Sequence, residues 1–595
     1  MANHDISLSD LPDELIQNIF HYLASPSLAP LRLVSKRFDA LAEEPLLWRD
    51  RCWTEFHYWD PRHSIQRKFT EPAALVNWKQ LYIYRFRVDR STTTELNSLL
   101  TSQTGRIEKI QTIADHGYDA KDTLLRHTRC DCNSEDVLAR RYYADAVLGC
   151  IQRKLAIDEW CKIKDGQDVP LERALGAFDM FVVQNREHDL DEISERLDEL
   201  AQHFRDTYSD FDTLSPRNQA LQLLDFARTK RLTGLDEGHN YSDIKNRFLG
   251  IALFSEDHSS LPLLSVTIYC SLARRLGLDA RPCAFPFHVH AIVQAPAETT
   301  LDGRSRGSSE GEERQRMFLD PWRSDTEIPL TDLEAQLRHI GVNPSEFSSY
   351  LGASQPNEMV LRNAHNIINA IQEAREDDPS SIVGDHFPNL DSAFYGALWA
   401  SLLLGPLQRR HHVGTLVRRQ YLPYVVRHFE THFPMDASLI EDYILPLFVN
   451  APEFTQLLET VRVIRAGDSV PKRVLSRAGV ADPSQLPKQK VGSVFRHRRY
   501  AYDAVIIGWD AECQAGEHWM QQMGIDRLSR GRHQSFYHAL VDDQTVRYVA
   551  EENLQIIHPE QPPADLLISA GKYFKRWDAE RCVFVSNIKD EYPDD

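Results

Sequence analysis

Two histidines lie close together in the segment RPCAFPFHVHAIVQA, which alternates and is rich in Val, Phe and Ile. This composition predicts a β-strand, in which every second side chain points to the same face. His288 and His290 flank Val289, so we expect both imidazoles on one face. Neutral imidazoles can hydrogen-bond in a core or a cleft, or can ligate a metal ion. We favour hydrogen bonding, and the sequence predicts no metal ion and no cofactor.

Cysteine side chains are the second candidates for chemistry, because a thiolate is a strong nucleophile. Cys270 lies in the segment PLLSVTIYCSLARRLGL, which is apolar on nearly all sides and predicts a buried helix. A thiol in such a helix is usually an inert core group. The nine cysteines are scattered, which predicts a reducing compartment, the cytoplasm or the nucleus. One group spans 24 residues, but its Cys-x-Cys spacing is poor for zinc and favours a plain helical linker: His127, Cys130, Cys132 and Cys150.

A small basic cluster near the end of the chain could meet a phosphate group. It consists of Arg496, Arg498 and Arg499, with Tyr500 beside them, and at strand spacing these side chains alternate between faces. Residues 488–554 hold nine Lys and Arg against nine Asp and Glu, whereas a duplex-binding domain usually has a basic excess. These residues are therefore a possible DNA or partner contact, and we favour contact with a protein.

The whole chain is acidic, with 68 Lys and Arg against 87 Asp and Glu and a net charge of −19. Such a charge repels nucleic-acid backbones and anionic membrane surfaces. No apolar run approaches the roughly 20 residues of a spanning helix, and MANHDISLSD has no secretory signal pattern. No P-loop, GxGxxG or HExxH motif occurs. We expect no membrane segment, no nucleotide chemistry and no zinc-protease chemistry.

Patterns of helix and strand divide the 595 residues into a multidomain α+β protein. Near the start, Leu11, Leu15 and Ile19 recur every four residues, which predicts an amphipathic helix in a small all-helical docking unit. The expected parts are the helical unit at 8–53, a helical linker region at 54–134, a mainly helical α+β domain at 135–350, a helical extension at 355–468, a linker at 469–487, a small all-β barrel at 488–560 and a C-terminal tail at 561–595.

Residues 11–48, LPDELIQNIFHYL followed by LRLVSKRFDALAEEPLLW, resemble the F-box. The resemblance implies docking on a Skp-type adaptor, and through it on a cullin-RING ubiquitin ligase, by an apolar helical surface. The residues expected to bind the adaptor are Leu11, Pro12, Leu15, Ile16, Ile19, Leu33 and Trp48.

The segment from YSDIKNRFLG to HAIVQA, with LDPW at 319–322, resembles the transglutaminase-like domain of the SirB1 family. That resemblance implies a nucleophilic Cys at the start of a buried helix, then a His and an Asp on successive strands. It assigns the latter two roles to His290 and Asp320, and it puts the Cys position near Pro262, which carries no nucleophile. With Trp322, these residues are expected to form a remnant cleft for target binding, so the domain is expected to be a binding platform without catalysis.

The segment from Val491 to Leu554 closely resembles the YccV/HspQ family, sometimes described as hemimethylated-DNA binding. With the two other resemblances, it indicates a layout found in eukaryotic F-box-only proteins. The layout implies a non-catalytic substrate receptor of a Skp-cullin-F-box ligase, which directs an unknown target protein to ubiquitin-dependent degradation. Two alternatives stay open at this point. One is a DNA-associated regulator acting through the YccV-like domain, and the other is a thiol enzyme in which Cys270 or Cys283 reaches His290.

Overall fold

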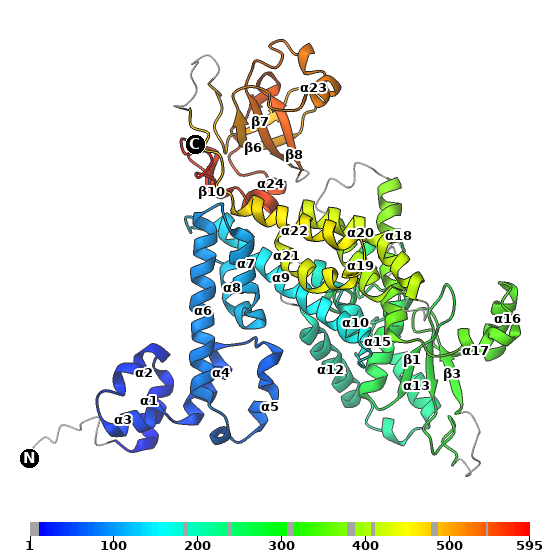
Figure 1. Cartoon of the computed structure of the whole chain (residues 1–595). Coiled ribbons are helices and arrows are strands. Elements are labelled where there is room, and N and C mark those ends of the chain that lie inside the picture. The colour runs from blue at the N-terminus through cyan, green and yellow to red at the C-terminus, as the bar shows by residue number, and fades with distance from the viewer. Residues whose placement is uncertain are drawn as a thin grey trace, which may run out of the picture. The chain divides into compact units, whose positions relative to one another are not determined.

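The computed structural model describes most of the chain, and the described residues form two compact units. One unit comprises residues up to Ile151 together with Arg465–Asp595, and the other comprises Gln152–Ile464. Helices predominate in both, and each unit also contains an antiparallel sheet (Figure 1). The described residues are 11–182, 188–235, 241–305, 314–377, 387–405, 411–477, 486–542 and 545–595. Within these ranges, no helix combines the length and the apolar composition needed to cross a bilayer.

Four short helices open the first unit: α1 (Asp13–Tyr22), α2 (Ser25–Leu31), α3 (Lys36–Ala42) and α4 (Pro45–Glu55). Ser35 caps α3 by accepting a hydrogen bond from the Phe38 amide, and Pro45 begins α4, where its missing N–H costs nothing. Ile16 and Phe20 of α1 are buried with Phe38. The predicted all-helical unit is therefore present from residue 11 onward, and residues 8–10 lie outside the described residues.

The core of these four helices extends into the region that the sequence assigns to a linker. Trp78 and Tyr82 of α6 (Trp78–Thr101) pack in the same apolar cluster as α1, α3 and α4. Such a short helical unit buries little surface alone, so the added aromatic area contributes to its stability. Helix α5 (Ile65–Thr70) precedes α6, and the helices after α6 are α7 (Arg106–Ala114), α8 (Lys121–Thr128) and α9 (Val137–Lys164).

The second unit contains a four-stranded antiparallel sheet in the order β1-β2-β3-β4. Its strands are β1 (Asp279–Pro282), β2 (Ala291–Gln294), β3 (Arg316–Leu319) and β4 (Glu327–Ile328). The continuous strand predicted for RPCAFPFHVHAIVQA is interrupted, because residues 284–290 leave the sheet between β1 and β2. Pro286 lacks the N–H that a ladder requires, and Phe287 adopts a left-handed φ of 64°. Strands β2 and β3 pair with each other across the segment that connects them. Residues 306–313 of that segment lie outside the described residues.

Helix α15 (Pro262–Arg275) packs against β1 and β2 of this sheet. It begins with a proline and is enclosed along nearly its whole length, as its apolar composition predicts. The other helices include α10 (Leu171–Gly176), α12 (Leu190–Thr207), α13 (Pro216–Thr229), α14 (Leu249–Phe254), α16 (Leu330–His339), α18 (Pro356–Asp377), α19 (Leu390–Leu404), α20 (His411–His432) and α22 (Glu453–Ser469).

The last part of the chain forms a five-stranded antiparallel sheet in the order β8-β7-β6-β5-β9. Its strands are β5 (Val494–His497), β6 (Asp503–Asp510), β7 (Phe536–Val541), β8 (Val546–Ala550) and β9 (Leu554–Ile556). A short helix, α23 (Glu517–Met523), lies in the connection between β6 and β7. The small all-β domain predicted from the sequence is thus present.

The segment 561–595, predicted as a tail, is instead folded. It contains α24 (Ala564–Ala570) and a two-stranded sheet of β10 (Phe574–Asp578) and β11 (Val583–Ser586). Phe574, Phe584 and Tyr592 are buried in the same core as the five-stranded sheet. The acidic ending KDEYPDD contains Tyr592, which is 4% exposed and anchors the end of the chain.

Candidate functional site

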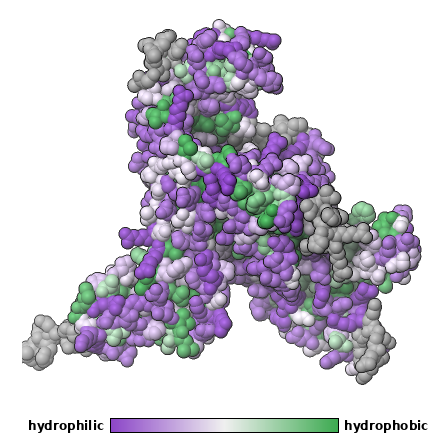
Figure 2. Space-filling model, viewed as in Figure 1, coloured by the Kyte–Doolittle hydropathy of each residue, from purple (hydrophilic) through white to green (hydrophobic). Residues whose placement is uncertain are grey.

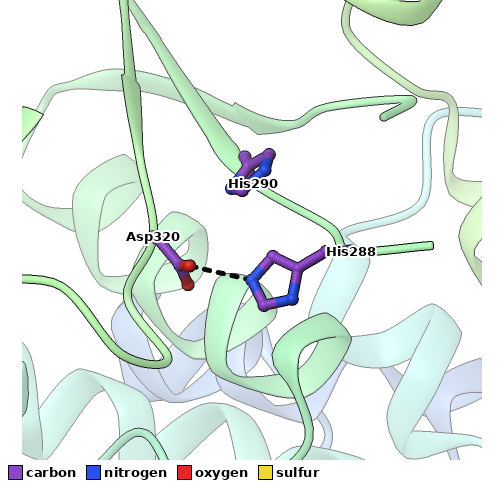
Figure 3. A group of neighbouring side chains, drawn as sticks. All are labelled: His288, His290 and Asp320. Carbon is purple, nitrogen blue, oxygen red and sulfur yellow. Dashed lines mark hydrogen bonds and ion pairs between the residues drawn. The ribbon is translucent and has the colours of Figure 1, made fainter. Parts of the chain in front are cut away.

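The four-stranded sheet brings together His288, His290 and Asp320 (Figure 3). Strands β2 and β3 pair with Ala291 opposite Leu319, so the residues next to that pair, His290 and Asp320, leave the sheet at the same end. One potential ligand atom of each side chain lies within 4.8 Å of those of the other two. His288 Nε2 is 2.9 Å from Asp320 Oδ2.

Asp320 is held as a charged carboxylate. Its Oδ1 accepts a hydrogen bond from the Trp322 amide at 3.2 Å, and its Oδ2 also accepts one from Arg323 Nε at 2.9 Å. Burial favours the protonated form, but the hydrogen bond and the charge of His288 outweigh it, and the pKa of Asp320 lies below its ordinary value. An ionised carboxylate bonded to an imidazole orients that ring, as in a general-base dyad.

His290 has a different environment from His288. It is 2% exposed, and its Nδ1 has no hydrogen-bond partner within the described residues. Burial, followed by the charge of His288, lowers the pKa of His290 to about 4, so its ring is neutral at neutral pH. The SirB1 resemblance implied His290 as the partner of Asp320, whereas the hydrogen bond is made by His288. Both rings nevertheless lie together, with centroids 4.9 Å apart.

Trp322, the third residue of the predicted cleft, lies beside His288. The two ring centroids are 5.7 Å apart, and Trp322 Nε1 donates a hydrogen bond to the carbonyl of Ser260 at 2.9 Å. Ser260 lies two residues before the start of α15, where the SirB1 resemblance puts the nucleophile. Its hydroxyl is 2.7 Å from that of Ser265, and neither serine is exposed. These two hydroxyls satisfy each other inside the protein.

The two thiols considered as nucleophiles are both held in the protonated form. Burial raises the pKa of Cys270 well above its ordinary value, and it raises the pKa of Cys283 to about 11. Cys283 Sγ also donates a hydrogen bond to the Tyr350 carbonyl at 3.3 Å. A protonated, buried thiol is a poor nucleophile, so the arrangement does not favour thiol chemistry.

Within the described ranges, His288, His290 and Asp320 form the one group of His, Cys, Asp and Glu side chains with metal-ligand spacing. The cysteine-rich segment predicted to be a plain linker is not part of such a group. There, Cys132 Sγ accepts a hydrogen bond from Arg141 at 3.3 Å.

The residues predicted to bind an adaptor fall into two groups. Pro12, Leu15, Ile19 and Leu33 are exposed, and Leu11 is partly exposed. Ile16 and Trp48 are instead 0% and 5% exposed, and Trp48 Nε1 donates to the Ala42 carbonyl at 2.7 Å. These two side chains can support an adaptor surface from beneath, but they do not form part of it.

Two further apolar side chains, which are not among the predicted adaptor contacts, are strongly exposed. Tyr22 is 90% exposed and continues the stripe of Leu15 and Ile19 along α1, while Val34 is 66% exposed beside Leu33. Hydrophobic residues also show at the surface of this part of the chain in Figure 2. The helical period could have revealed Tyr22, which lies three residues after Ile19.

The basic cluster of the five-stranded sheet is largely engaged within the protein. Arg496 makes two hydrogen bonds to Asp503, at 2.7 and 2.9 Å, and Arg498 Nε donates to the Leu554 carbonyl at 3.1 Å. Arg499 lies over the ring of Tyr500, which is 62% exposed. An arginine already paired with a carboxylate offers little net charge to a phosphate.

Comparison with known proteins gives three family matches in the order expected from the sequence. An F-box-like family matches residues 8–53, a transglutaminase-like superfamily matches 191–365, and a family described as hemimethylated DNA-binding protein YccV like matches 487–581. The chain combines F-box-like, transglutaminase-like and YccV-like segments. The last match extends past residue 560 into the folded segment that the sequence had suggested to be a tail.

Curated relatives match over a short part of the chain. "F-box only protein 21" of Mus musculus is 35% identical over 112 residues, which are 18% of this chain and 16% of that protein. The Homo sapiens protein of the same name is 34% identical over 112 residues, with the same two shares. The matched part thus spans about a sixth of the length of these relatives. No solved structure matches the chain.

Proposed function

We propose that this protein is the substrate-recognition subunit of a Skp-cullin-F-box ubiquitin ligase. The observation that carries the proposal is the row of exposed apolar side chains on α1, which lies over a well-packed core. Leu15 is 49% exposed and Ile19 is 36% exposed, while Ile16 and Phe20, the next residues in sequence, are enclosed in the core. Exposed apolar stripes on a helix are typical of surfaces that dock a partner.

The exposed side chains offer enough apolar area for a specific contact. Burying a large aliphatic or aromatic side chain contributes roughly 1.5–3 kcal/mol when it leaves water. Leu15, Ile19, Leu33 and Tyr22 therefore provide a set of anchors whose burial would offset the entropy lost on association. The F-box-like match over residues 8–53 covers this surface and supports a Skp-type adaptor as its partner.

In this proposal the chain positions a target protein and carries out no chemistry itself. Holding a target lysine near a ubiquitin-loaded enzyme raises its effective concentration, and bond making takes place on other subunits. The raised pKa values of Cys270 and Cys283 support a non-catalytic role. The surroundings of His288 and Asp320 and the YccV-like segment are the proposed places for the target. Nine free cysteines fit a reducing compartment, the cytoplasm or the nucleus.

The description of the YccV-like family keeps DNA binding as an alternative function for the last domain. The pairing of Arg496 with Asp503 argues against it, since no surplus of positive charge remains at that position. DNA binding would need retention on duplex DNA with a steep salt dependence. A gel shift at low salt with the full chain distinguishes the two functions.

Co-purification of the full chain with a Skp-type adaptor tests the proposal. We expect the wild-type chain to form a 1:1 complex and Leu15→Asp to lose it, because a carboxylate cannot be buried unpaired in an apolar contact. The matched control is Leu75→Asp, since Leu75 is 75% exposed and lies outside the α1 stripe. A complex that survives Leu15→Asp, or no complex with the wild type, would refute adaptor docking by this surface.

A further inference from the structure

We propose that His288, His290 and Asp320 form a binding site for a divalent first-row transition metal such as Zn²⁺. The inference concerns the transglutaminase-like segment and does not depend on adaptor docking. Two imidazoles and one carboxylate match the ligand preferences of such metals better than those of Mg²⁺ or Ca²⁺, which favour oxygen. Figure 3 shows the three side chains side by side, with the contact between His288 and Asp320 drawn.

The spacing of the ligand atoms is close to what a metal requires. Zn²⁺ binds nitrogen and carboxylate oxygen at roughly 2.0–2.2 Å, which puts tetrahedral ligands about 3.3 Å apart. In the structure the His288 and Asp320 atoms are 2.9 Å apart, and all three ligand atoms lie within 4.8 Å of one another. Side-chain movements of about 1 Å would therefore bring them to ligand distance.

A second observation, independent of the spacing, also points to a ligand. His290 is 2% exposed, and the Nδ1 atom of its ring is buried without a hydrogen-bond partner among the residues that the structure describes. Buried polar atoms in native proteins nearly always have a partner, which can be an ion. A metal bound to the His290 ring would explain why a polar side chain is enclosed at this position.

The surrounding structure holds two of the ligands firmly. Asp320 is 1% exposed, and its other oxygen, Oδ1, accepts the Trp322 amide. The carbonyl of His290 accepts a hydrogen bond from the Cys283 amide at 2.7 Å, which fixes the backbone of that ligand. Bonds of this kind behind the ligands orient them toward the metal. His288 is more open, with its side chain 19% exposed, so the ion would keep a position that solvent or a target side chain can occupy.

The Arg323 guanidinium competes with a metal ion for Asp320. Arg323 Nε donates to the same Asp320 oxygen at 2.9 Å, but the Arg323 side chain is 61% exposed and can move into solvent. Metal binding requires the His288 Nε2 lone pair, so the proton on that nitrogen must move to Nδ1 or leave the ring. We therefore infer that Arg323 neutralises Asp320 when no ion is bound and is displaced when one binds.

The test is a titration of the chelator-treated full chain with Zn²⁺ in a calorimeter, repeated with Co²⁺ to record its visible absorption. We expect one ion per chain to bind at this site, with Co²⁺ bands typical of nitrogen and oxygen ligands. His288→Gln and Asp320→Asn should each weaken binding by more than about 100-fold, because even residues behind metal ligands contribute about 10- to 100-fold. His339→Gln, an exposed histidine of α16, is the matched control and should bind normally.

The Arg323→Gln variant tests the competition directly. It should bind Zn²⁺ about two- to fivefold more tightly, which is the factor expected for an exposed ion pair. Zn²⁺ should also raise the melting temperature of the wild type but not that of His288→Gln, and the melting transition of that variant shows that it is folded. A wild-type chain that binds no ion, binding that is unchanged in both ligand variants, or an Arg323→Gln affinity equal to that of the wild type would each overturn the proposal.

Discussion

At the residue scale, neighbouring side chains on α1 have opposite environments. Leu15 is 49% exposed, whereas Ile16 is 0% exposed and packs with Phe20 and Phe38. The first is available to a partner, and the second holds the helix on the rest of the unit. Adaptor binding and stability are therefore separable by single substitutions one residue apart.

Alanine substitutions at Leu15 and Ile16 should show that adaptor binding and stability are separable. Ile16→Ala should lower the free energy of unfolding by about 2–5 kcal/mol, because it leaves a cavity in the core. Leu15→Ala should change it by less than about 0.5 kcal/mol but weaken adaptor binding. Urea unfolding followed by circular dichroism measures the first effect, and calorimetric titration with adaptor measures the second. Equal losses of stability would contradict the assignment of Leu15 to the surface.

Glu551 provides a prediction about pH. Burial favours its protonated form, but ion pairs with Lys488 and Arg530 outweigh this and lower its pKa below the ordinary value. A carboxylate with a lowered folded pKa contributes stability above its unfolded pKa of about 4.3, and that contribution is lost as pH falls through the folded pKa. Glu551→Gln should therefore be less stable than the wild type at neutral pH, with a difference that shrinks below about pH 4.3.

Melting of the full chain at a series of pH values measures this difference. The matched control is Glu580→Gln, since Glu580 is exposed in the turn between β10 and β11. A Glu551→Gln difference that stays constant from neutral to acid pH would mean that the ion pairs do not stabilise the fold.

At the element scale, the C-terminal sheet depends on a close approach between the residues that lead into β5 and strand β11. Gly492 has φ of +93°, and its carbonyl accepts the Phe584 amide at 3.0 Å. A Cβ atom at Gly492 would lie 1.9 Å from the Phe584 carbonyl oxygen. Only glycine fits there, both because of the left-handed backbone and because of the contact.

Gly492→Ala should detach β10 and β11 from the five-stranded sheet. The left-handed conformation alone costs a non-glycine residue roughly 1–3 kcal/mol, and the clash adds to that. Hydrogen exchange of peptides from residues 572–595, measured by mass spectrometry in the full chain, should become faster. Gly467→Ala is the control, because a Cβ atom added at Gly467, within α22, would meet no other atom within 4 Å and alanine favours a helix. Unchanged exchange in Gly492→Ala would refute the close contact.

Across the whole molecule, the order of segments and their fold class could be predicted from patterns, while finer placements could not. Leu15 and Ile16 of α1 are both apolar, so their residue types do not say which of the two faces the core. His288 reaches Asp320 because the chain turns at Phe287, whose φ of 64° no pattern reveals. The packing of Phe574 on the preceding five-stranded sheet is a tertiary effect, although the short apolar runs near it do signal strands.

The apolar clusters also separate adaptor docking from the C-terminal sheet. The cluster beneath α1 includes Trp78 and Tyr82, whereas Phe574, Phe584 and Tyr592 belong to the cluster of the five-stranded sheet. Deletion of residues 561–595 exposes that second cluster and leaves the first intact. The two proposed activities, docking the adaptor and holding a target, should therefore fail independently.

A chain that ends at residue 560 should retain the adaptor but lose its C-terminal fold. Removal of three large buried aromatic side chains, each contributing about 3–5 kcal/mol, exceeds what a domain of this size can lose. We expect rapid proteolysis of residues 488–560 with unchanged co-purification of the adaptor, while Leu15→Asp in the full chain should give the reverse pattern. A shortened chain that loses the adaptor would show that the two clusters stabilise each other, because α1 itself would be unaltered.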